Sequence, residues 1–322
     1  MLEQLEPLTT TPVAYGFAIL LGLLWGSFAN VCIYRWPPTD AFPEGRSVIK
    51  PPSHCGACLQ PIAWYDNVPL LSWLWLRGKC RRCQAPFSAR YLIVEAATAA
   101  LFGVAWWAAV VGGALFEPLD TRLLRFVIYA AFCFVMVVIT FIDLDHKLIL
   151  NKVTIPSIIA FYVLGLVLPE RLWWEGLVGA AVGYGVPWAI GEIYYRVTGR
   201  EGLGLGDSML LAVIGALLGW RGVVVALFGG SVIGSVLGIM ALVLARRRAD
   251  EGVDEGAADR ATEGADADPR PPPTAETDET SESIDPSLMR TELPFGPFLA
   301  MAAVFYLVAE PWVQLHFTLL GG

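Results

Sequence analysis

The sequence has little charge for a chain of its length. Charged residues make up 16% of its 322 positions, whereas a soluble globular domain carries roughly 25%. Hydrophobic residues make up 56%, and the mean hydropathy is +0.57. Several apolar stretches approach or exceed the ~20 residues that cross a bilayer as a helix. The composition therefore excludes an ordinary soluble domain and indicates an all-α, polytopic protein of the lipid bilayer.

The N-terminus lacks the basic residues of a cleavable signal peptide. It opens with the acidic segment MLEQLEP, and the apolar stretch from Val13 is too long for the hydrophobic region of a signal. We therefore expect a permanent first span. The split between the sixth and seventh spans depends on the polar turn GWRG at 219–222. The eight predicted spans are 13–34, 91–115, 122–142, 153–168, 172–195, 207–219, 222–245 and 295–318.

Basic residues are scarce on one side of the predicted membrane. Only Arg122, Arg125, Arg171 and Arg221 lie there, and the other eighteen Lys and Arg lie on the opposite side. Because loops rich in Lys and Arg stay in the cytoplasm, we expect that side to be cytoplasmic and both termini to be periplasmic. No nucleic-acid partner is expected. The cytoplasmic loops are 35–90, 143–152, 196–206 and 246–294.

The net charge of −8 comes from one of these loops. Residues 250–292 hold fourteen acidic and three basic residues, and the rest of the chain has a net charge of +3. Low hydrophobicity with excess negative charge predicts disorder, so we interpret this acidic insert as a solvated linker. The predicted regions are a first transmembrane helix (1–34), a cytoplasmic tetra-cysteine domain (35–90), a transmembrane core (91–245), the acidic insert (246–294) and a last transmembrane helix with the C-terminus (295–322).

Four of the six cysteines form two Cys-x-x-Cys pairs, namely Cys55, Cys58, Cys80 and Cys83. Two such turns can complete a tetrahedral thiolate site for zinc, and four protein ligands make the site structural instead of catalytic. Two disulfides or a redox pair are the alternative, which a reducing cytoplasm disfavours. A loop this short has little core, so the metal would supply folding energy. Cys32 and Cys133 fall inside spans and are interpreted as packing residues.

Carboxylates at the ends of apolar spans are costly and therefore candidates for function. Asp143 and Asp145 end the third span, and Asp207 begins the sixth. The predicted topology brings them to the same membrane face. Two carboxylates within hydrogen-bond reach share a proton, as in aspartic proteases. Asp143 and Asp145 lie about 200° apart around a helix, so only one of them can face Asp207.

The segment GLGLGD around Asp207 offers two interpretations. Glycines such as Gly204 and Gly206 let the backbone leave helical geometry, so that an extended peptide substrate can approach. In the alternative, Asp207 only caps a helix N-terminus, where Asp is favoured, and Asp143 is an interfacial charge. The residues alone leave both interpretations open.

Five segments together resemble the type IV prepilin peptidases, the bifunctional leader peptidase/N-methyltransferases of type IV pilus and type II secretion systems. The first is similar to the family's Gly-Ser-Phe-x-Asn-Val start, the second to its cysteine-bearing domain, the third and fourth to its two catalytic segments, and the fifth to a C-terminal signature. In order, they are GLLWGSFANVCIYRWP (22–37), residues 55–98, FIDLDHKLILN (141–151), GLGLGD (202–207) and LPFGPFLAMAA (293–303).

The resemblance implies an aspartic endopeptidase of the bacterial inner membrane. Such an enzyme removes the basic leader of prepilins or pseudopilins on the cytoplasmic side and methylates the new N-terminus with S-adenosylmethionine. It implies that Asp143 and Asp207 are the catalytic pair, since Asn151 follows Asp143 at the family's spacing. The sequence departs from the family at Leu150, where Pro is common, and at Met209, where Lys is common.

The methyltransferase cannot be placed from sequence. No glycine-rich Rossmann fingerprint follows a strand, so the residues that bind the cofactor are unknown. Glu95 and the pair Asp66–Asn67 are candidates, for which a structural role is the simpler interpretation. Two alternatives to the full function are a peptidase without methyltransferase activity and a non-catalytic membrane assembly protein. The second predicts that Asp143 and Asp207 lie far apart.

Overall fold

The computed structural model describes residues 6–112, 117–200, 204–263 and 294–320. It divides into two units, residues 1–230 with 295–322 and residues 231–294. The described residues form helices and three isolated β-bridges, with no β-strand. The predicted helical fold is thus confirmed for these residues.

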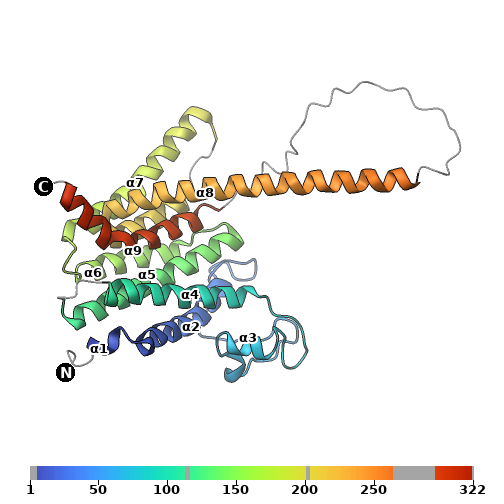
Figure 1. Ribbon diagram of the computed structural model, residues 1–322, viewed down its shortest axis with the longest axis horizontal. Coiled ribbons are helices and arrows are strands. Elements are labelled where there is room, and N and C mark those ends of the chain that lie inside the picture. Colours follow the sequence, from blue (N-terminus) through green and yellow to red (C-terminus); the bar gives the residue numbers. More distant parts are fainter. Residues whose placement is uncertain (1–5, 113–116, 201–203, 264–293, 321–322) are drawn as a thin grey trace. The chain divides into compact units, whose positions relative to one another are not determined.

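The first unit is a bundle of long helices. Helix α2 packs on α4, α4 on α5, and α5 on both α9 and α6 (Figure 1). Helix α1 and the C-terminal end of α9 lie at one end of the bundle, and the loop that carries α3 lies at the other (Figure 1). The elements are α1 (Glu6–Thr9), α2 (Pro12–Arg35), η2 (Trp64–Asn67), α3 (Leu71–Trp75), α4 (Arg90–Trp106), η3 (Trp107–Val111), α5 (Leu119–His146), α6 (Asn151–Gly165), α7 (Trp173–Thr198), α8 (Leu205–Glu263) and α9 (Gly296–Leu320).

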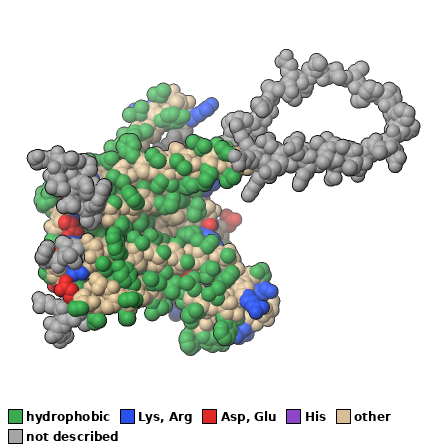
Figure 2. Space-filling view, viewed as in Figure 1, with side chains coloured by type: hydrophobic (Ala, Val, Ile, Leu, Met, Phe, Trp, Pro, Cys, Tyr) green, Lys and Arg blue, Asp and Glu red, His purple; other side chains and the backbone are tan. Residues whose placement is uncertain are grey.

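Helix α5 forms the centre of this bundle, because apolar side chains surround it on most of its faces. Its buried residues include Cys133, and Cys32 of α2 is also fully buried, so both cysteines pack in the core as predicted. Figure 2 shows hydrophobic side chains covering the flanks of the helices, while charged side chains gather toward their ends. This distribution is that of a membrane protein.

By length and composition, four of the described helical stretches can cross a membrane. Helix α6 has 15 residues and is shorter than a usual span. The backbone of α8 breaks at Gly219 (φ 69°, ψ −177°), a conformation that glycine adopts without steric cost. This break lies at the predicted turn between the sixth and seventh spans. The four stretches are Pro12–Arg35, Arg90–Val111, Leu119–His146 and Leu205–Leu244.

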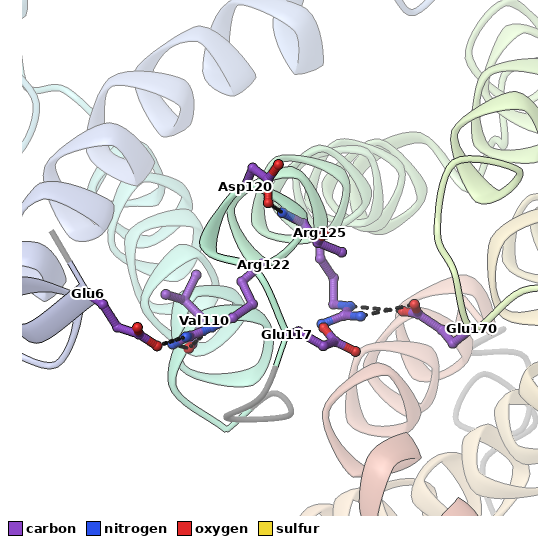
Figure 3. Close-up of polar contacts among 8 residues, drawn as sticks. Glu6, Val110, Glu117, Asp120, Arg122, Arg125 and Glu170 are labelled. Carbon is purple, nitrogen blue, oxygen red and sulfur yellow. Dashed lines mark hydrogen bonds and ion pairs between the residues drawn. The ribbon is translucent and has the colours of Figure 1, made fainter. Parts of the chain in front are cut away.

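Arginines near the end of the bundle that carries α1 lie in ion pairs with glutamates. Arg122 lies between Glu6 and the carbonyl of Val110, and Arg125 lies between Glu117 and Glu170 (Figure 3). Burial opposes ionisation of Glu170, but hydrogen bonds from Arg125 outweigh it and lower the pKa of Glu170. The pairs are Arg122–Glu6 (2.9 Å), Arg125–Glu117 (2.6 Å), Arg125–Glu170 (2.8 Å) and Arg171–Glu310 (2.5 Å).

The second unit contains the continuation of α8. Residues 246–263, which composition predicts to be disordered, are helical in the structure. Ala, Arg and Glu are strong helix formers and are frequent in this stretch, RRRADEGVDEGAADRATE. The rest of the predicted acidic insert, residues 264–293, lies outside the described residues.

Candidate functional site: a carboxylate pair and a four-cysteine cluster

Asp143 lies in the last turn of α5 with its side chain turned into the bundle. It is 5% exposed, whereas Asp145, two residues later, is exposed and forms an ion pair with Arg90 of α4. The helix continues through both residues and ends at His146. The structure therefore separates the two aspartates as helical geometry requires: Asp143 faces inward, and Asp145 has an arginine partner.

Asp207 lies in the first turn of α8, half-buried, and close enough to Asp143 for the two charges to interact. The backbone of Gly204, just before the helix, also hydrogen-bonds to the Asp207 carboxylate. That second contact is the one by which an acidic residue in a first turn caps a helix. The two interpretations left open by the sequence are thus compatible, because Asp207 both caps α8 and lies within electrostatic range of Asp143.

A third segment, the start of α9, also reaches the carboxylate pair. The backbone N–H of Gly296 donates a hydrogen bond of 3.1 Å to Oδ2 of Asp143. A β-carbon at position 296 would lie 2.5 Å from that oxygen, closer than any real contact of this kind. Only glycine fits here without moving the carboxylate. Segments 153 residues apart in the chain therefore meet at Asp143.

The structure describes two of the three glycines of the GLGLGD segment, and their settings differ. Gly206 lies inside α8, where a β-carbon would come within 3.0 Å of Cβ of Ile149. Its small size therefore permits close packing against the segment that follows Asp143. Gly204 lies outside the helix and has more room around it. Gly202 lies outside the described residues.

The four cysteines predicted to bind zinc come together in the part of the chain that connects α2 to α4. Their sulfur atoms all lie within 4.8 Å of one another, and the Sγ atoms of Cys55 and Cys83 are 3.7 Å apart. Zn–S bonds of about 2.3 Å in a tetrahedron place sulfurs about 3.8 Å apart. Among the described residues, the cluster contains no histidine, and His54 instead lies near the carbonyl of Pro52.

The two halves of the cluster are built alike. In one, the N–H of Leu59 donates to the carbonyl of Cys55, and in the other the N–H of Gln84 donates to that of Cys80. Leu59 and Gln84 both have positive φ angles, 58° and 59°. Each turn is closed by a β-bridge, His54 with Pro61 and Lys79 with Pro86. The underlying repeat, Cys-x-x-Cys-x-x-Pro, is visible in the sequence.

The pKa values of Cys55 and Cys83 are shifted in opposite directions. Backbone N–H groups of Cys58 and Ala57 lower the pKa of the Cys55 thiol to about 6. The N–H of Ala85 acts in the same direction on Cys83, but burial and the other three thiols raise its pKa to about 11. Four thiolates so close together repel one another unless a cation neutralises them. The donor set and its spacing therefore fit Zn²⁺.

Comparison with known proteins places these two sites in two matched regions. Residues 20–109, which include the cysteines, match the Bacterial Peptidase A24 N-terminal domain. Residues 130–239, which include Asp143 and Asp207, match the Type IV leader peptidase family. A prepilin leader peptidase/N-methyltransferase of Myxococcus xanthus (strain DK1622) is 33% identical over 94% of this chain and 92% of its own length. The chain belongs to the type IV leader peptidase family.

Other members of this leader peptidase family match a smaller share of the chain. A prepilin leader peptidase/N-methyltransferase of Aeromonas hydrophila is 37% identical over 68% of this chain and 78% of its own length. One of Neisseria gonorrhoeae is 35% identical over 70% and 81% of the respective lengths. No solved structure matches this leader peptidase chain.

Two further residues at the site were not assigned roles from sequence. Gly296 belongs to the C-terminal signature of the family resemblance, yet nothing in its spacing indicates a contact with Asp143. Arg90 joins the two matched regions, since it pairs with Asp145 and donates a hydrogen bond of 3.0 Å to the carbonyl of Phe141. A cation just before the second span, facing the aspartates that end the third, is the signal that could have predicted this pair.

Proposed function

We propose that this protein is a membrane aspartic endopeptidase that removes the leader from type IV prepilins or type II secretion pseudopilins and then methylates the new N-terminus. The observation that carries the proposal is the meeting of Asp143, Asp207 and the Gly296 N–H at one end of the bundle. The printed names of the relatives join both activities in one protein.

The carboxylate pair is suited to peptide hydrolysis. Two carboxylates whose charges repel hold one proton between them. The ionised member takes a proton from water, and the protonated member polarises the scissile carbonyl. The Gly296 N–H stabilises negative charge on Asp143, which favours Asp143 as the member that accepts the proton. Among the described residues, no ion pair includes Asp143 or Asp207. No arginine or lysine of these residues therefore holds either carboxylate in its ionised form.

The proposed membrane arrangement has eight spans, with both termini periplasmic and the carboxylate pair at the cytoplasmic face. The break at Gly219 supports two spans within α8. The position of α1 and the C-terminal end of α9 at one end of the bundle, opposite α3, supports an even number of crossings (Figure 1). The prepilin's apolar helix would enter from the bilayer, and its basic leader would stay in the cytoplasm with loop 35–90.

Zinc at Cys55, Cys58, Cys80 and Cys83 would stabilise the fold of the cytoplasmic domain and would take no part in cleavage. S-adenosylmethionine would supply the methyl group for the new N-terminus. Replacing Cys80 with serine should remove about one zinc per chain, as measured by metal analysis of the purified protein. Zinc content equal to that of the parent protein would contradict this site.

The decisive experiment compares the two aspartates in the last turn of α5 with the one in the first turn of α8. Asp143→Asn and Asp207→Asn should each slow prepilin cleavage in membranes by about 10²–10⁴-fold, the usual contribution of acid–base groups. Asp145→Asn is the matched control and should cleave at nearly the parental rate, because Asp145 pairs with Arg90 and not with the dyad. Cleavage by both dyad variants at the parental rate would refute the proposal.

Methylation is a separate outcome of the same assay. Mass spectrometry of the processed pilin should find a new N-terminus that carries one additional methyl group. A processed but unmethylated N-terminus would support the alternative of a peptidase without methyltransferase activity.

A further inference from the structure

A cavity of about 520 Å³ lies between the helical bundle and the cysteine loop. Helices α2 and α4 form one wall, and the segments around the two cysteine turns and α3 form the other. Binding sites for small molecules usually measure about 300–1,000 Å³ and combine apolar walls with a few placed polar groups. The residues used below are Ser27, Tyr34, Trp73, Lys79, Tyr91 and Glu95.

The Gly-Ser-Phe-x-Asn-Val segment of α2, which is not part of the proposed carboxylate site, contributes to one wall of this cavity. At Gly26 a β-carbon would come within 2.7 Å of the Cα of Glu95, so glycine permits α2 and α4 to touch. The Ser27 side chain lies close to the Glu95 carboxylate, and Asn30 Nδ2 donates to the carbonyl of Tyr91 at 3.1 Å. The segment therefore holds Glu95 and Tyr91 in place.

Glu95 is a buried carboxylate held without a cation. It is 9% exposed, and its Oε2 accepts a hydrogen bond of 2.8 Å from the N–H of Leu70. Leu70 has a positive φ of 56°, which is strained for a branched residue. Among the ion pairs of the described residues, none includes Glu95. A buried charge of this kind is stabilised when a ligand supplies the opposite charge.

The other walls suit a ligand that is part aromatic and part zwitterionic. Tyr34, Trp73 and Tyr91 offer aromatic faces, on which planar rings and cations both pack favourably. The indole nitrogen of Trp73 has no hydrogen-bond partner among the described residues. Lys79 provides a positive charge on the side of the cysteine loop. The cavity thus presents a carboxylate, aromatic surfaces and an ammonium group.

We propose that this cavity binds S-adenosylmethionine, with Glu95 facing its cationic amino-acid and sulfonium end. The inference rests on the proposed function, because the ligand is the methyl donor of that function. The position also suits it. Tyr91 and Glu95 line the cavity from α4, and Arg90 at the start of the same helix contacts the end of α5 that carries Asp143. A new N-terminus formed at the dyad therefore arises beside the helix that forms this cavity.

Ultraviolet cross-linking of the full-length protein in detergent with radiolabelled S-adenosylmethionine tests the proposal directly. Peptide mapping should place the label on tyrosine or tryptophan peptides within 27–34, 64–76 or 88–95, and excess unlabelled S-adenosylmethionine should remove it. Label confined to any other part of the chain, or no label that unlabelled ligand displaces, would overturn the proposal. This measurement needs no variant and no catalytic turnover.

Equilibrium binding of the same ligand then tests Glu95. Glu95→Gln preserves the shape of the side chain and should weaken binding about 10–100-fold, as expected for loss of one charge-assisted contact. Glu192→Gln on the exposed face of α7 is the control carboxamide and should bind like the parent protein. Equal binding by the parent and Glu95→Gln would overturn the role of Glu95.

Parent membranes that fail to cleave prepilins would refute the proposed function, whereas cleavage with label outside the cavity would refute only this inference.

Discussion

At one end of the helical bundle, carboxylates pair with arginines, whereas at the other end two carboxylates interact with each other and with backbone N–H groups. Glu6, Glu117, Glu170 and Glu310 each pair with an arginine of a different segment. Asp143 and Asp207 interact with each other and with backbone N–H groups of Gly296 and Gly204. Arg122, Arg125, Glu310 and Asp143 are buried, so both arrangements place charge inside an apolar fold, where charge is costly.

The difference separates two uses of buried charge. A buried ion pair contributes little net stability, but it fixes which segments meet, because removing one partner leaves the other uncompensated. The arginine pairs therefore hold the bundle in register. A carboxylate pair without a cation has no such structural use, since its members repel each other. The proposed catalytic role gives the pair a use, and the comparison predicts opposite responses to substitution at the two ends.

The largest expected effect is at the carboxylate pair. Asp207→Asn should slow cleavage by about 10²–10⁴-fold and leave the melting temperature in detergent equal to or above that of the parent protein. The physical reason is that the neutral amide removes repulsion with Asp143 while it can still accept the Gly204 hydrogen bond. Thermal unfolding followed by circular dichroism measures this. A large drop in melting temperature would show that Asp207 is mainly a structural residue.

Arg125 should respond in the opposite way. Arg125→Met leaves Glu117 and Glu170 without their shared partner and should cost about 3–5 kcal/mol of stability, as for other broken buried pairs. Cleavage per folded molecule should change little. The control is Arg196→Met on α7. The Arg196 side chain is 75% exposed and pairs with Glu192, so this variant should shift stability by less than about 1 kcal/mol. Equal melting temperatures for both variants would remove the distinction between the two ends.

Sequence reasoning predicted those features that depend on spacing and charge alone. The two Cys-x-x-Cys pairs, the split of α8 near residue 219 and the helical class follow from local patterns. The meeting of Asp143 with Asp207 was inferred from topology, since both were placed at one membrane face. The same charge count predicted Arg122, Arg125 and Arg171 on the opposite side, but it did not predict their glutamate partners.

Other features depend on tertiary contacts that no local pattern contains. The Gly296 bond to Asp143 joins segments separated by 153 residues, and the cavity near Glu95 exists only because α2, α4 and the cysteine loop meet. At residues 246–263, net charge predicted disorder, whereas the helix propensity of Ala, Arg and Glu agrees with the observed helix. The prediction relied on net charge and neglected helix propensity, whereas the observed helix at 246–263 agrees with helix propensity.

Gly296 offers a milder change at the carboxylate end. Gly296→Ala would place a methyl group 2.5 Å from Oδ2 of Asp143, so the carboxylate must move. Cleavage should fall about 10–100-fold, because small misplacements of a reacting group cost this much, and its pH profile should shift. The rate of prepilin processing across pH measures both effects. Gly185→Ala on α7, where a β-carbon meets no other atom within 4 Å, is the control, and parental cleavage by both variants would contradict a positioning role for Gly296.

The smallest effect concerns pH at the arginine end. Hydrogen bonds from Arg125 hold the pKa of Glu170 below its usual value, although burial alone would raise it. The pair therefore stabilises the fold above the unfolded pKa of a glutamate, about 4.3, and this contribution disappears as pH falls through the lower folded pKa. Glu170→Gln should lower the free energy of unfolding by about 1–2 kcal/mol near neutral pH. The loss is limited because Arg125 still forms its ion pair with Glu117. The melting temperatures of variant and parent should converge below about pH 4, and a gap that stays constant from neutral to acid pH would show that the loss comes from packing and not from the charge of Glu170.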